Sequence, residues 1–363
     1  MTTICLSMIV KNEAHVIARC LASVKPLLSH WVIVDTGSTD GTQDLVRKAL
    51  ADVPGELFER PWVDFATNRT EALALAREKG GADYVLVVDA DDVLVVPPAI
   101  ALPTLTHDAY ALRVEYDGTT FYRTQLLKAS LPWRYEGVVH EAPACDAPFE
   151  PATLEGIVYR IVGGGARSRD PDRYRKDAEL LERELAKDPT HARYAFYLGQ
   201  SYRDAGDHER AIAAYERRAT MGGWGEEVFY SLLQAAALRE LLGQPRETVW
   251  SAYLKAHQSR PERAEALAAL ARYCRLAGEL ALAFVFADAA AAIPRPRDVL
   301  FVDESVYAWR ALDELAIAAF YTNRFDRSAA ASARLLTEGR LPAGELERVR
   351  KNFAFVADAR APR

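Results

Sequence analysis

Short apolar runs separated by helical patterns fill the first part of the chain. Residues 4–10, 31–34 and 84–88 are apolar runs of strand length that lack polar alternation, which is typical of strands covered on both faces of a parallel sheet. Residues 56–59 predict a further short strand, and apolar positions at helical spacing predict helices between the strands, such as residues 65–79. This order predicts an α/β fold with right-handed crossovers and its strand ends along one rim.

Polar residues follow three of these strands. Residues 11–13 are Lys-Asn-Glu, residues 35–38 are Asp-Thr-Gly-Ser, and residues 89–92 are Asp-Ala-Asp-Asp. Asp89 and Asp91 are two residues apart, so at a strand end both carboxylates can approach one hard cation such as Mg²⁺ or Mn²⁺. An isolated Asp-x-Asp is more often a solvated turn. Three polar strand ends in this order instead predict a site of nucleotide size.

The next segment is less regular. Residues 109–116 and 119–128 predict two strands joined at Asp117-Gly118, which is a strong hairpin signal. Residues 133–141, Trp-Arg-Tyr-Glu-Gly-Val-Val-His-Glu, combine aromatic, acidic and imidazole side chains at a density that a core strand seldom needs. Residues 157–162 predict a last strand.

Three glycines follow at residues 163–165, where they permit close backbone approach and large motion. Arg167 and Arg169 come next, and guanidinium groups match the geometry of phosphates. This segment is either a lid that closes over a diphosphate or a linker with solvated charges.

Together these motifs resemble the family 2 glycosyltransferases of the GT-A fold. The resemblance covers residues 1–165 and rests on residues 10–13, 35–38, 68–69 and 89–91, in that order. It implies a nucleobase pocket lined by the first motif, and a second motif near the base or ribose. The nucleotide-sugar-binding residues that it implies are Val10, Lys11, Asn12, Glu13, Asp35, Arg69, Asp89 and Ala90, to which a lid adds Arg167.

The same resemblance implies a metal cofactor, Mn²⁺ or Mg²⁺, with Asp91 as a ligand. In enzymes resembling this one, a Trp-x-Tyr-x-Gly-x-x-His-Glu segment lies across the sheet from the Asp-x-Asp. The resemblance therefore implies His140 as a further metal ligand or a diphosphate contact, although a lone histidine is more often structural.

The implied reaction is an in-line displacement with inversion, in which a carboxylate takes the proton of the acceptor. Glu141, Glu136 and Asp92 are the available bases. We favour Glu141, but neighbouring side chains on a regular strand point to opposite faces, so His140 and Glu141 share one cleft only at a bulge or a strand end. The choice of base stays open.

From residue 172 onward strand patterns disappear and a helical repeat begins. Its units fit a tetratricopeptide spacing, with Leu198-Gly199 and Tyr215 in the first unit, a shift of 38 residues to the second and of 34 to the third. A looser fourth unit spans about residues 307–336, and residues 344–358 predict a closing helix. The recurring small and aromatic positions are expected to be core.

These patterns predict an α/β GT-A domain, with a mixed sheet covered by helices, followed by an all-α repeat domain. We expect residues 1–165 to be the catalytic domain, residues 166–190 a hinge or lid with a linking helix, and residues 191–363 the repeats with their cap. The layout resembles bacterial peptide and protein glycosyltransferases.

Composition narrows the classes of partner and compartment. The formal net charge of -6 gives no general footprint for nucleic acid. There is no apolar run of 18 residues and no cleavable leader pattern, so we expect no membrane span and a cytoplasmic location. The four cysteines have no metal-ligand spacing.

The leading interpretation is a metal-dependent inverting glycosyltransferase. Its donor is a nucleoside-diphosphate sugar, most commonly a UDP-sugar in relatives of this layout, and its acceptor is a hydroxyl or thiol of a peptide or protein. A homodimer through the repeats is a further expectation. The alternatives are a surface polysaccharide or other non-peptide acceptor, and a non-catalytic nucleotide-binding repeat scaffold. A nucleotidyltransferase ranks last because no glycine-rich basic loop follows the first strand.

Overall fold

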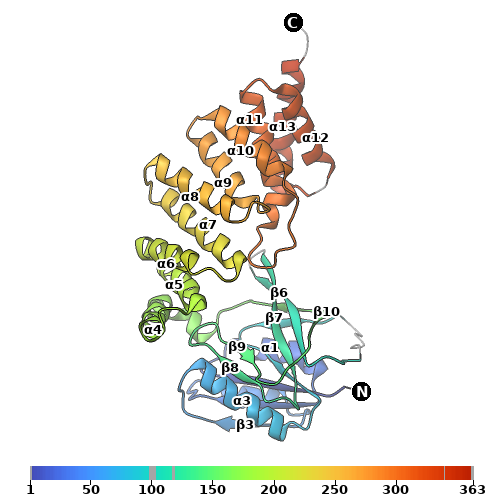
Figure 1. Ribbon diagram of the computed structural model, residues 1–363. Coiled ribbons are helices and arrows are strands. Elements are labelled where there is room, and N and C mark those ends of the chain that lie inside the picture. Colours follow the sequence, from blue (N-terminus) through green and yellow to red (C-terminus); the bar gives the residue numbers. More distant parts are fainter. Residues whose placement is uncertain (1, 98–103, 117–118, 339, 361–363) are drawn as a thin grey trace. The chain divides into compact units, whose positions relative to one another are not determined.

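The computed structural model describes residues 2–97, 104–116, 119–338 and 340–360 (Figure 1). The chain forms two compact units, residues 1–183 and residues 184–363. The division falls inside residues 166–190, the stretch that the sequence assigns to the hinge and linking helix.

A mixed sheet forms the centre of the first unit. Its order within the described residues is β3-β2-β1-β4-β7-β6-β10-β5, and β1 pairs in parallel with both β2 and β4. A separate pair, β8-β9, is antiparallel. The strands are β1 (Ile4–Val10), β2 (His30–Asp35), β3 (Gly55–Glu59), β4 (Tyr84–Val87), β5 (Val93–Val95), β6 (Ala109–Tyr116), β7 (Thr119–Lys128), β8 (Arg134–Glu136), β9 (Ala142–Ala144) and β10 (Pro151–Arg160).

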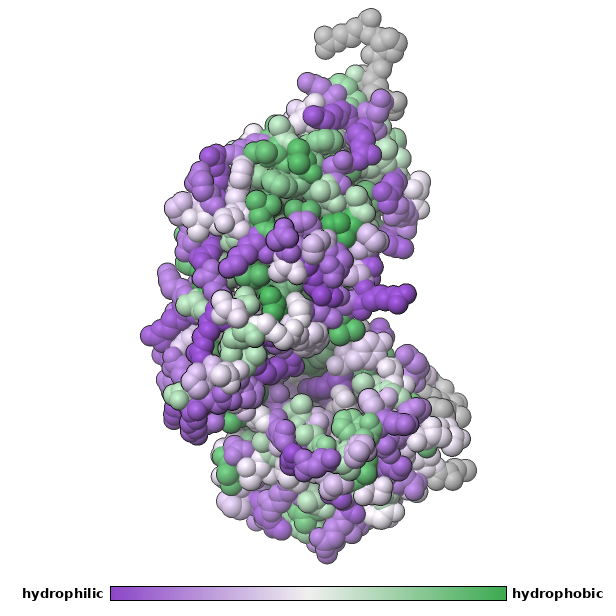
Figure 2. All heavy atoms as spheres, viewed as in Figure 1, coloured by the Kyte–Doolittle hydropathy of each residue, from purple (hydrophilic) through white to green (hydrophobic). Residues whose placement is uncertain are grey.

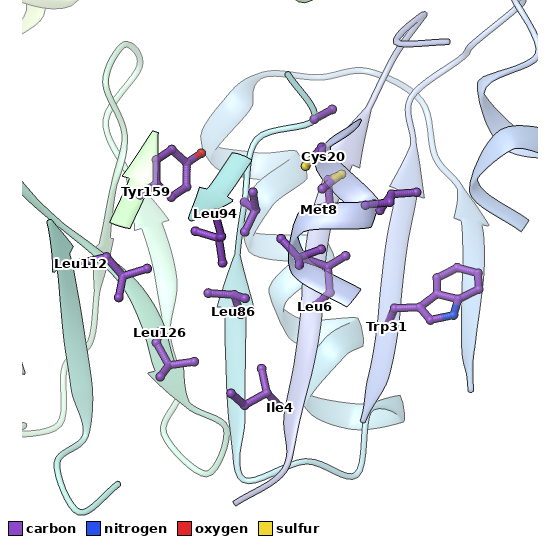
Figure 3. Close-up of a cluster of buried hydrophobic side chains, with 14 of the residues drawn as sticks. Ile4, Leu6, Met8, Cys20, Trp31, Leu86, Leu94, Leu112, Leu126 and Tyr159 are labelled. Atoms are coloured by element: carbon purple, nitrogen blue, oxygen red, sulfur yellow. The ribbon is translucent and has the colours of Figure 1, made fainter. Parts of the chain in front are cut away.

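Helices cover both faces of this sheet, and the side chains of each strand point alternately toward one face and the other. Ile4, Leu6 and Met8 of β1 belong to the core cluster that includes the buried face of α1 (Figure 3). Cys5, between them, belongs to the cluster that includes Leu73 of α3. The helices of this unit are α1 (Ile17–Val24), α2 (Thr42–Ala49) and α3 (Phe65–Lys79), with short 3-10 turns at Lys25–Leu27 and Ala166–Arg169.

The strand and helix predictions are confirmed with two differences. The predicted turn at Asp117-Gly118 lies outside the described residues. The last strand begins six residues earlier than the predicted 157–162, at Pro151, and its register shifts between Thr153 and Val158. Its first half pairs with β6 although it has little apolar character, which is why periodicity missed it.

Residues 133–141 do not form one strand. They contribute β8 and then a loop, in which Gly137 has φ +113° and His140 has φ +54°, before the chain enters β9. The backbone N–H of Tyr135 donates to Thr70 Oγ1 at 2.9 Å, which ties β8 to α3. The strand alternation that would separate His140 from Glu141 therefore does not apply to this loop.

The second unit is a stack of antiparallel helix pairs, as the repeat spacing predicts. Gly199 shows why small residues recur, since a Cβ there would lie 2.6 Å from Cδ1 of the fully buried Tyr215 ring. The helices are α4 (Arg173–Lys187), which crosses the division, α5 (Ala192–Asp204), α6 (His208–Thr220), α7 (Gly225–Leu241), α8 (Arg246–Ser259), α9 (Glu265–Leu276), α10 (Leu280–Ala292), α11 (Ala311–Tyr321), α12 (Phe325–Thr337) and α13 (Ala343–Arg360).

Two further features concern the surface of the molecule. No helix among the described residues has the length and apolar character needed to cross a bilayer.

On the second unit, apolar side chains gather on the visible surface toward the C-terminal helices (Figure 2). The large exposed apolar residues of that unit include Leu276, Leu282, Val285, Tyr321 and Phe355.

Candidate functional site

The loops that follow β1 and β2 are tied together by side chains. The backbone N–H of Asn12 donates to Ser38 Oγ at 2.8 Å, and Asn12 Oδ1 accepts from the N–H of Thr39 at 2.8 Å. Asn12 has φ +56°, a left-handed conformation that asparagine tolerates. The next N–H, of Glu13, donates to Thr42 Oγ1 at 2.9 Å. Two of the predicted motifs therefore form one edge of a common rim.

Asp35 lies at the end of β2 and is almost completely buried. Its Oδ1 accepts from the N–H groups of Gly37 and Ser38, at 2.9 and 2.8 Å. Its Oδ2 has no hydrogen-bond partner among the described residues. Because a buried acceptor without a partner costs free energy, this oxygen is suited to receive an N–H or O–H from a ligand.

Arg69, near the start of α3, joins two acidic residues that are far apart in the sequence. Its Nη2 donates to Asp89 Oδ1, and its Nε donates to Glu141 Oε1 at 2.5 Å. The side chains of Arg69 and Glu141 are only 14% and 10% exposed, so these are shielded ion pairs. The loop between β8 and β9 thus brings Glu141 to the Asp-x-Asp segment.

The other oxygen of Asp89 is also occupied. Arg123 Nη2, from β7, lies 3.4 Å from Asp89 Oδ2, and the hydroxyl of Tyr159, from β10, donates to the same oxygen at 3.3 Å. Burial alone would raise the pKa of Asp89, but the charges of Arg69 and Arg123 lower the pKa below its ordinary value. Asp89 is therefore a charged carboxylate held from both sides.

The glycine-rich segment lies against Asp91. Asp91 Oδ2 accepts from the N–H of Gly165 at 3.0 Å, and a Cβ at position 165 would lie 2.7 Å from that oxygen, so a larger residue there would displace the carboxylate. Arg19 and His15 fix the same segment, since Arg19 Nη2 donates to the carbonyl of Asp91 at 2.6 Å and His15 Nε2 lies 2.6 Å from the carbonyl oxygen of Gly164. One carboxylate oxygen of Asp91 is engaged, and Oδ1 has no recorded partner among the described residues.

Two further acids line the same edge, of which Asp92 is buried and Glu13 is partly buried. Asp92 Oδ1 accepts from the N–H of Val162 at 3.1 Å. Burial raises the pKa of Asp92 to about 6, and the carboxylates of Asp89 and Asp91 act in the same direction. Burial also raises the pKa of Glu13, whose carboxylate accepts from the N–H of Ala166 at 3.1 Å.

The described residues contain no group of three His, Cys, Asp or Glu side chains that could hold a metal ion. The roles of Asp91 and His140 as metal ligands stay predictions. His140 is exposed in the loop between β8 and β9. A Mg²⁺ ion is usually held by one or two carboxylates together with substrate phosphates, and Asp91 fits that arrangement.

Several other predicted site residues have no contact with Asp35, Asp89 or Asp91 among those described above. Glu136 is exposed and its carboxylate pairs with Arg134 at 2.5 Å. Arg167 pairs with Asp177 at 2.6 Å and lies over the ring of Phe65. Val10 and Ala90 are buried, and Lys11 is exposed. Their roles stay predictions.

Four residues at this rim were missed by the sequence reasoning: His15, Arg19, Arg123 and Tyr159. Arg123 and Tyr159 sit inside strand patterns, where a polar or aromatic residue gives no sign of its target. His15 and Arg19 lie on the polar side of a helical pattern, which is usually solvated. The presence of Arg123 within a strand pattern marked it as unusual, but did not indicate which residue it contacts.

Parts of the chain are similar to known proteins. Residues 5–102 match the family model described as glycosyl transferase family 2. The chain is 25% identical over 224 residues to the SPbeta prophage-derived glycosyltransferase SunS of Bacillus subtilis, which is 58% of this chain and 51% of SunS. A TPR repeat-containing protein of Synechococcus elongatus is 34% identical over 129 residues, 32% of this chain and 30% of that protein. The chain thus spans about half of these relatives or less.

Solved structures with a partial likeness include S. aureus TarS 1–349 in complex with UDP-GlcNAc. It is 14% identical with a TM-score of 0.35, and the match covers 67% of this chain and 93% of that one. A tetratricopeptide repeat protein from Parabacteroides merdae is 20% identical with a TM-score of 0.37, over 52% of this chain and 69% of that one.

Proposed function

We propose that this chain, whose N-terminal unit carries a domain of glycosyltransferase family 2, transfers a sugar from a nucleoside-diphosphate donor to an acceptor nucleophile. The observation that carries the proposal lies within the matched segment. There the ends of β1, β2 and β4 supply a buried carboxylate with an unpartnered oxygen, at Asp35, and an Asp-x-Asp at Asp89–Asp91. The buried acceptor suits a base or ribose, and the Asp-x-Asp suits a metal ion bound to the diphosphate, so one rim carries both kinds of group that a donor needs.

The nucleoside is assigned to the rim formed by residues 10–13 and Asp35. The unpartnered Oδ2 of Asp35 is an acceptor for an N–H of the base or a hydroxyl of the ribose. Asn12 and Glu13 are fixed by the loop after β2, so the pocket wall needs little reorganisation on binding. A UDP-sugar is the proposed donor.

The metal, Mn²⁺ or Mg²⁺, is assigned to Asp91 and the donor phosphates. A divalent ion there supplies positive charge that stabilises the departing nucleoside diphosphate. Asp91 points a carboxylate to the rim, and the N–H of Gly165 orients it. His140 is a candidate contact to the diphosphate.

Glu141 is the proposed general base. Of the three candidates, it is the one whose carboxylate lies in the shielded Arg69 cluster, whereas Glu136 is exposed and pairs with Arg134. The ion pair with Arg69 orients the Glu141 carboxylate, which would accept the proton of the attacking hydroxyl or thiol. Inversion at the anomeric carbon is part of the proposal.

The repeats are the proposed recognition unit for a peptide or protein acceptor. A cavity of about 510 Å³ in the second unit is lined by residues of α9, α11, α12 and α13, among them Phe320, Tyr321 and Phe355. The exposed apolar surface near these helices supports a homodimer through the repeats as a further proposal.

The experiment that tests the donor site is calorimetric and thermal-shift binding of UDP, GDP, dTDP and CDP, each with and without Mn²⁺ or Mg²⁺. We expect metal-enhanced binding of one diphosphate. Asp35→Asn should weaken the binding of the free nucleoside as well as the binding of the diphosphate, since it alters the contact with the base or ribose. If none of the four binds with either metal, the proposed function is wrong.

A further inference from the structure

Arg123 lies outside the segment that matches the family model, yet its guanidinium group reaches the Asp-x-Asp. It comes from β7, where it pairs with Leu112 of β6. Leu112 belongs to the core cluster that includes α1, so Arg123 is on the face of the sheet that packs against α1. Figure 3 shows Tyr159 of that cluster at the same end of the sheet as Met8, toward the carboxyl end of β1.

Three neighbours fix the plane of this guanidinium. It stacks over the ring of Tyr159, with Cζ 4.5 Å from the ring centroid. The amide of Gln125, placed with its oxygen toward Arg123, accepts from Nε at 2.8 Å and from Nη2 at 2.7 Å. Asp89 Oδ2 is the third neighbour. Stacking and an oriented acceptor preorganise a guanidinium for donating to the oxygens of an anion such as a phosphate.

One edge of the group remains available. Among the described residues, Nη1 of Arg123 has no recorded acceptor, and the side chain is 36% exposed. A purely structural arginine is engaged differently. Arg218 in the second unit is 1% exposed, and its Nε, Nη1 and Nη2 all donate to protein oxygens. Arg123 is held at one edge and open at the other.

Asp89 explains how two guanidinium groups are kept beside each other. Its Oδ1 accepts from Arg69, and its Oδ2 faces Arg123 and the hydroxyl of Tyr159. Both oxygens are engaged by the protein. In this geometry the negative charge of Asp89 holds the two guanidinium groups together against their mutual repulsion. Both groups can then interact with an anion that enters the rim.

We infer that Arg123 binds the diphosphate of the donor, and that Asp89 and Tyr159 are positioning residues for its guanidinium group. The inference rests on the proposed function, since it names a residue for the same donor site. A departing diphosphate is a multivalent anion with several oxygens on tetrahedral phosphorus, and the free N–H groups of Nη1 on a stacked arginine can donate to these oxygens. Arg69 and Arg123 would then share the charge of the leaving group.

The test compares UDP with uridine, which lacks the phosphates, by calorimetry with Mn²⁺ on the full chain. Arg123→Met should weaken UDP binding at least about tenfold while leaving uridine binding unchanged, because a charge-assisted contact to phosphate is lost. Tyr159→Phe should give a smaller loss for UDP. Arg160→Met is the matched control, since Arg160 follows Tyr159 on β10 and pairs with Glu115, and it should change neither.

The outcomes separate the two claims. If the wild-type chain binds UDP and Arg123→Met binds UDP and uridine with unchanged affinities, this inference is wrong and the proposed function stands. If the preferred diphosphate is another one, that diphosphate and its nucleoside replace UDP and uridine. If Arg123→Met does not fold, Arg123→Lys keeps the charge but not the planar fork, and an undiminished preference for UDP over uridine would overturn the inference.

Discussion

Both units bury charged side chains, but the two use them differently. In the second unit, Arg218 and Glu227 are nearly inaccessible, and the guanidinium donates to the carboxylate at 3.0 and 2.9 Å and to the carbonyl of Gly222 at 2.8 Å. In the first unit, Asp35 is as deeply buried, but its Oδ2 has no hydrogen-bond partner among the residues that the structure describes. The Arg218–Glu227 pair therefore fixes structure, whereas Asp35 at the rim leaves an acceptor open to a ligand.

The sequence separations differ as well. Arg218 and Glu227 are nine positions apart, on consecutive helices. The contact of Arg69 with Glu141 spans 72 positions, and that of Asp91 with Gly165 spans 74. The Arg218–Glu227 pair is thus a contact between consecutive helices, whereas these two contacts at the rim join segments that are distant in the sequence. Substitutions should separate these two roles.

The largest effect is expected for Asp91→Asn. The change keeps an acceptor for the N–H of Gly165 but removes the charge proposed to hold the metal, so transfer should fall on the order of a thousandfold. The free energy of unfolding, measured with urea, should stay within about 0.5 kcal/mol of the wild type. Asp44→Asn on exposed α2 is the control. Transfer within tenfold of the wild type would remove the metal assignment.

Glu227→Gln should be the largest change in stability. It leaves the buried Arg218 without its counter-charge, which costs about 3 kcal/mol in free energy of unfolding of the second unit. Urea unfolding followed by circular dichroism measures this loss, and diphosphate affinity should be unchanged. The exposed Glu209→Gln serves as control. A loss below about 1 kcal/mol would mean that the pair contributes little beyond packing.

Glu141→Gln should lower turnover about a hundredfold, because the amide keeps an acceptor for Arg69 but takes no proton. Donor affinity should change little, which steady-state kinetics and calorimetry together establish. Glu136→Gln, on the exposed end of β8, should be near normal. The reverse result, with Glu136→Gln impaired and Glu141→Gln active, would transfer the base role to Glu136.

The smallest effect is expected for Gly199→Ala. A Cβ there would meet the buried Tyr215 ring at 2.6 Å, and the strain should exceed the gain in helix propensity, for a net loss of about 1 kcal/mol. Gly344→Ala in α13 has open space around its Cβ and should be neutral or stabilising. Thermal unfolding of both variants gives the comparison. Equal midpoints would show that α5 and α6 have room to separate.

Much of the fold could be predicted because its signals are local. Apolar runs of strand length gave β1 and β4, helical spacing gave α3, and small residues at repeat spacing gave the helix pairs. Residues 151–155 escaped because they pair with β6 while carrying few apolar side chains. The loop from Gly137 to Glu141 could not be placed from the sequence, because a turn with two left-handed residues leaves no periodic trace.

The sequence by itself determined which polar residues follow the strands, and parallel strand order was enough to place Asn12, Asp35 and Asp91 on one edge. Only the tertiary structure decided which groups touch. It brought Arg69 to Glu141, placed Arg123 and Tyr159 on Asp89, and left Glu136 with Arg134. Periodicity records the face on which a side chain lies within its own element. The partner across the sheet depends on strand order and register, which are set by packing between distant segments.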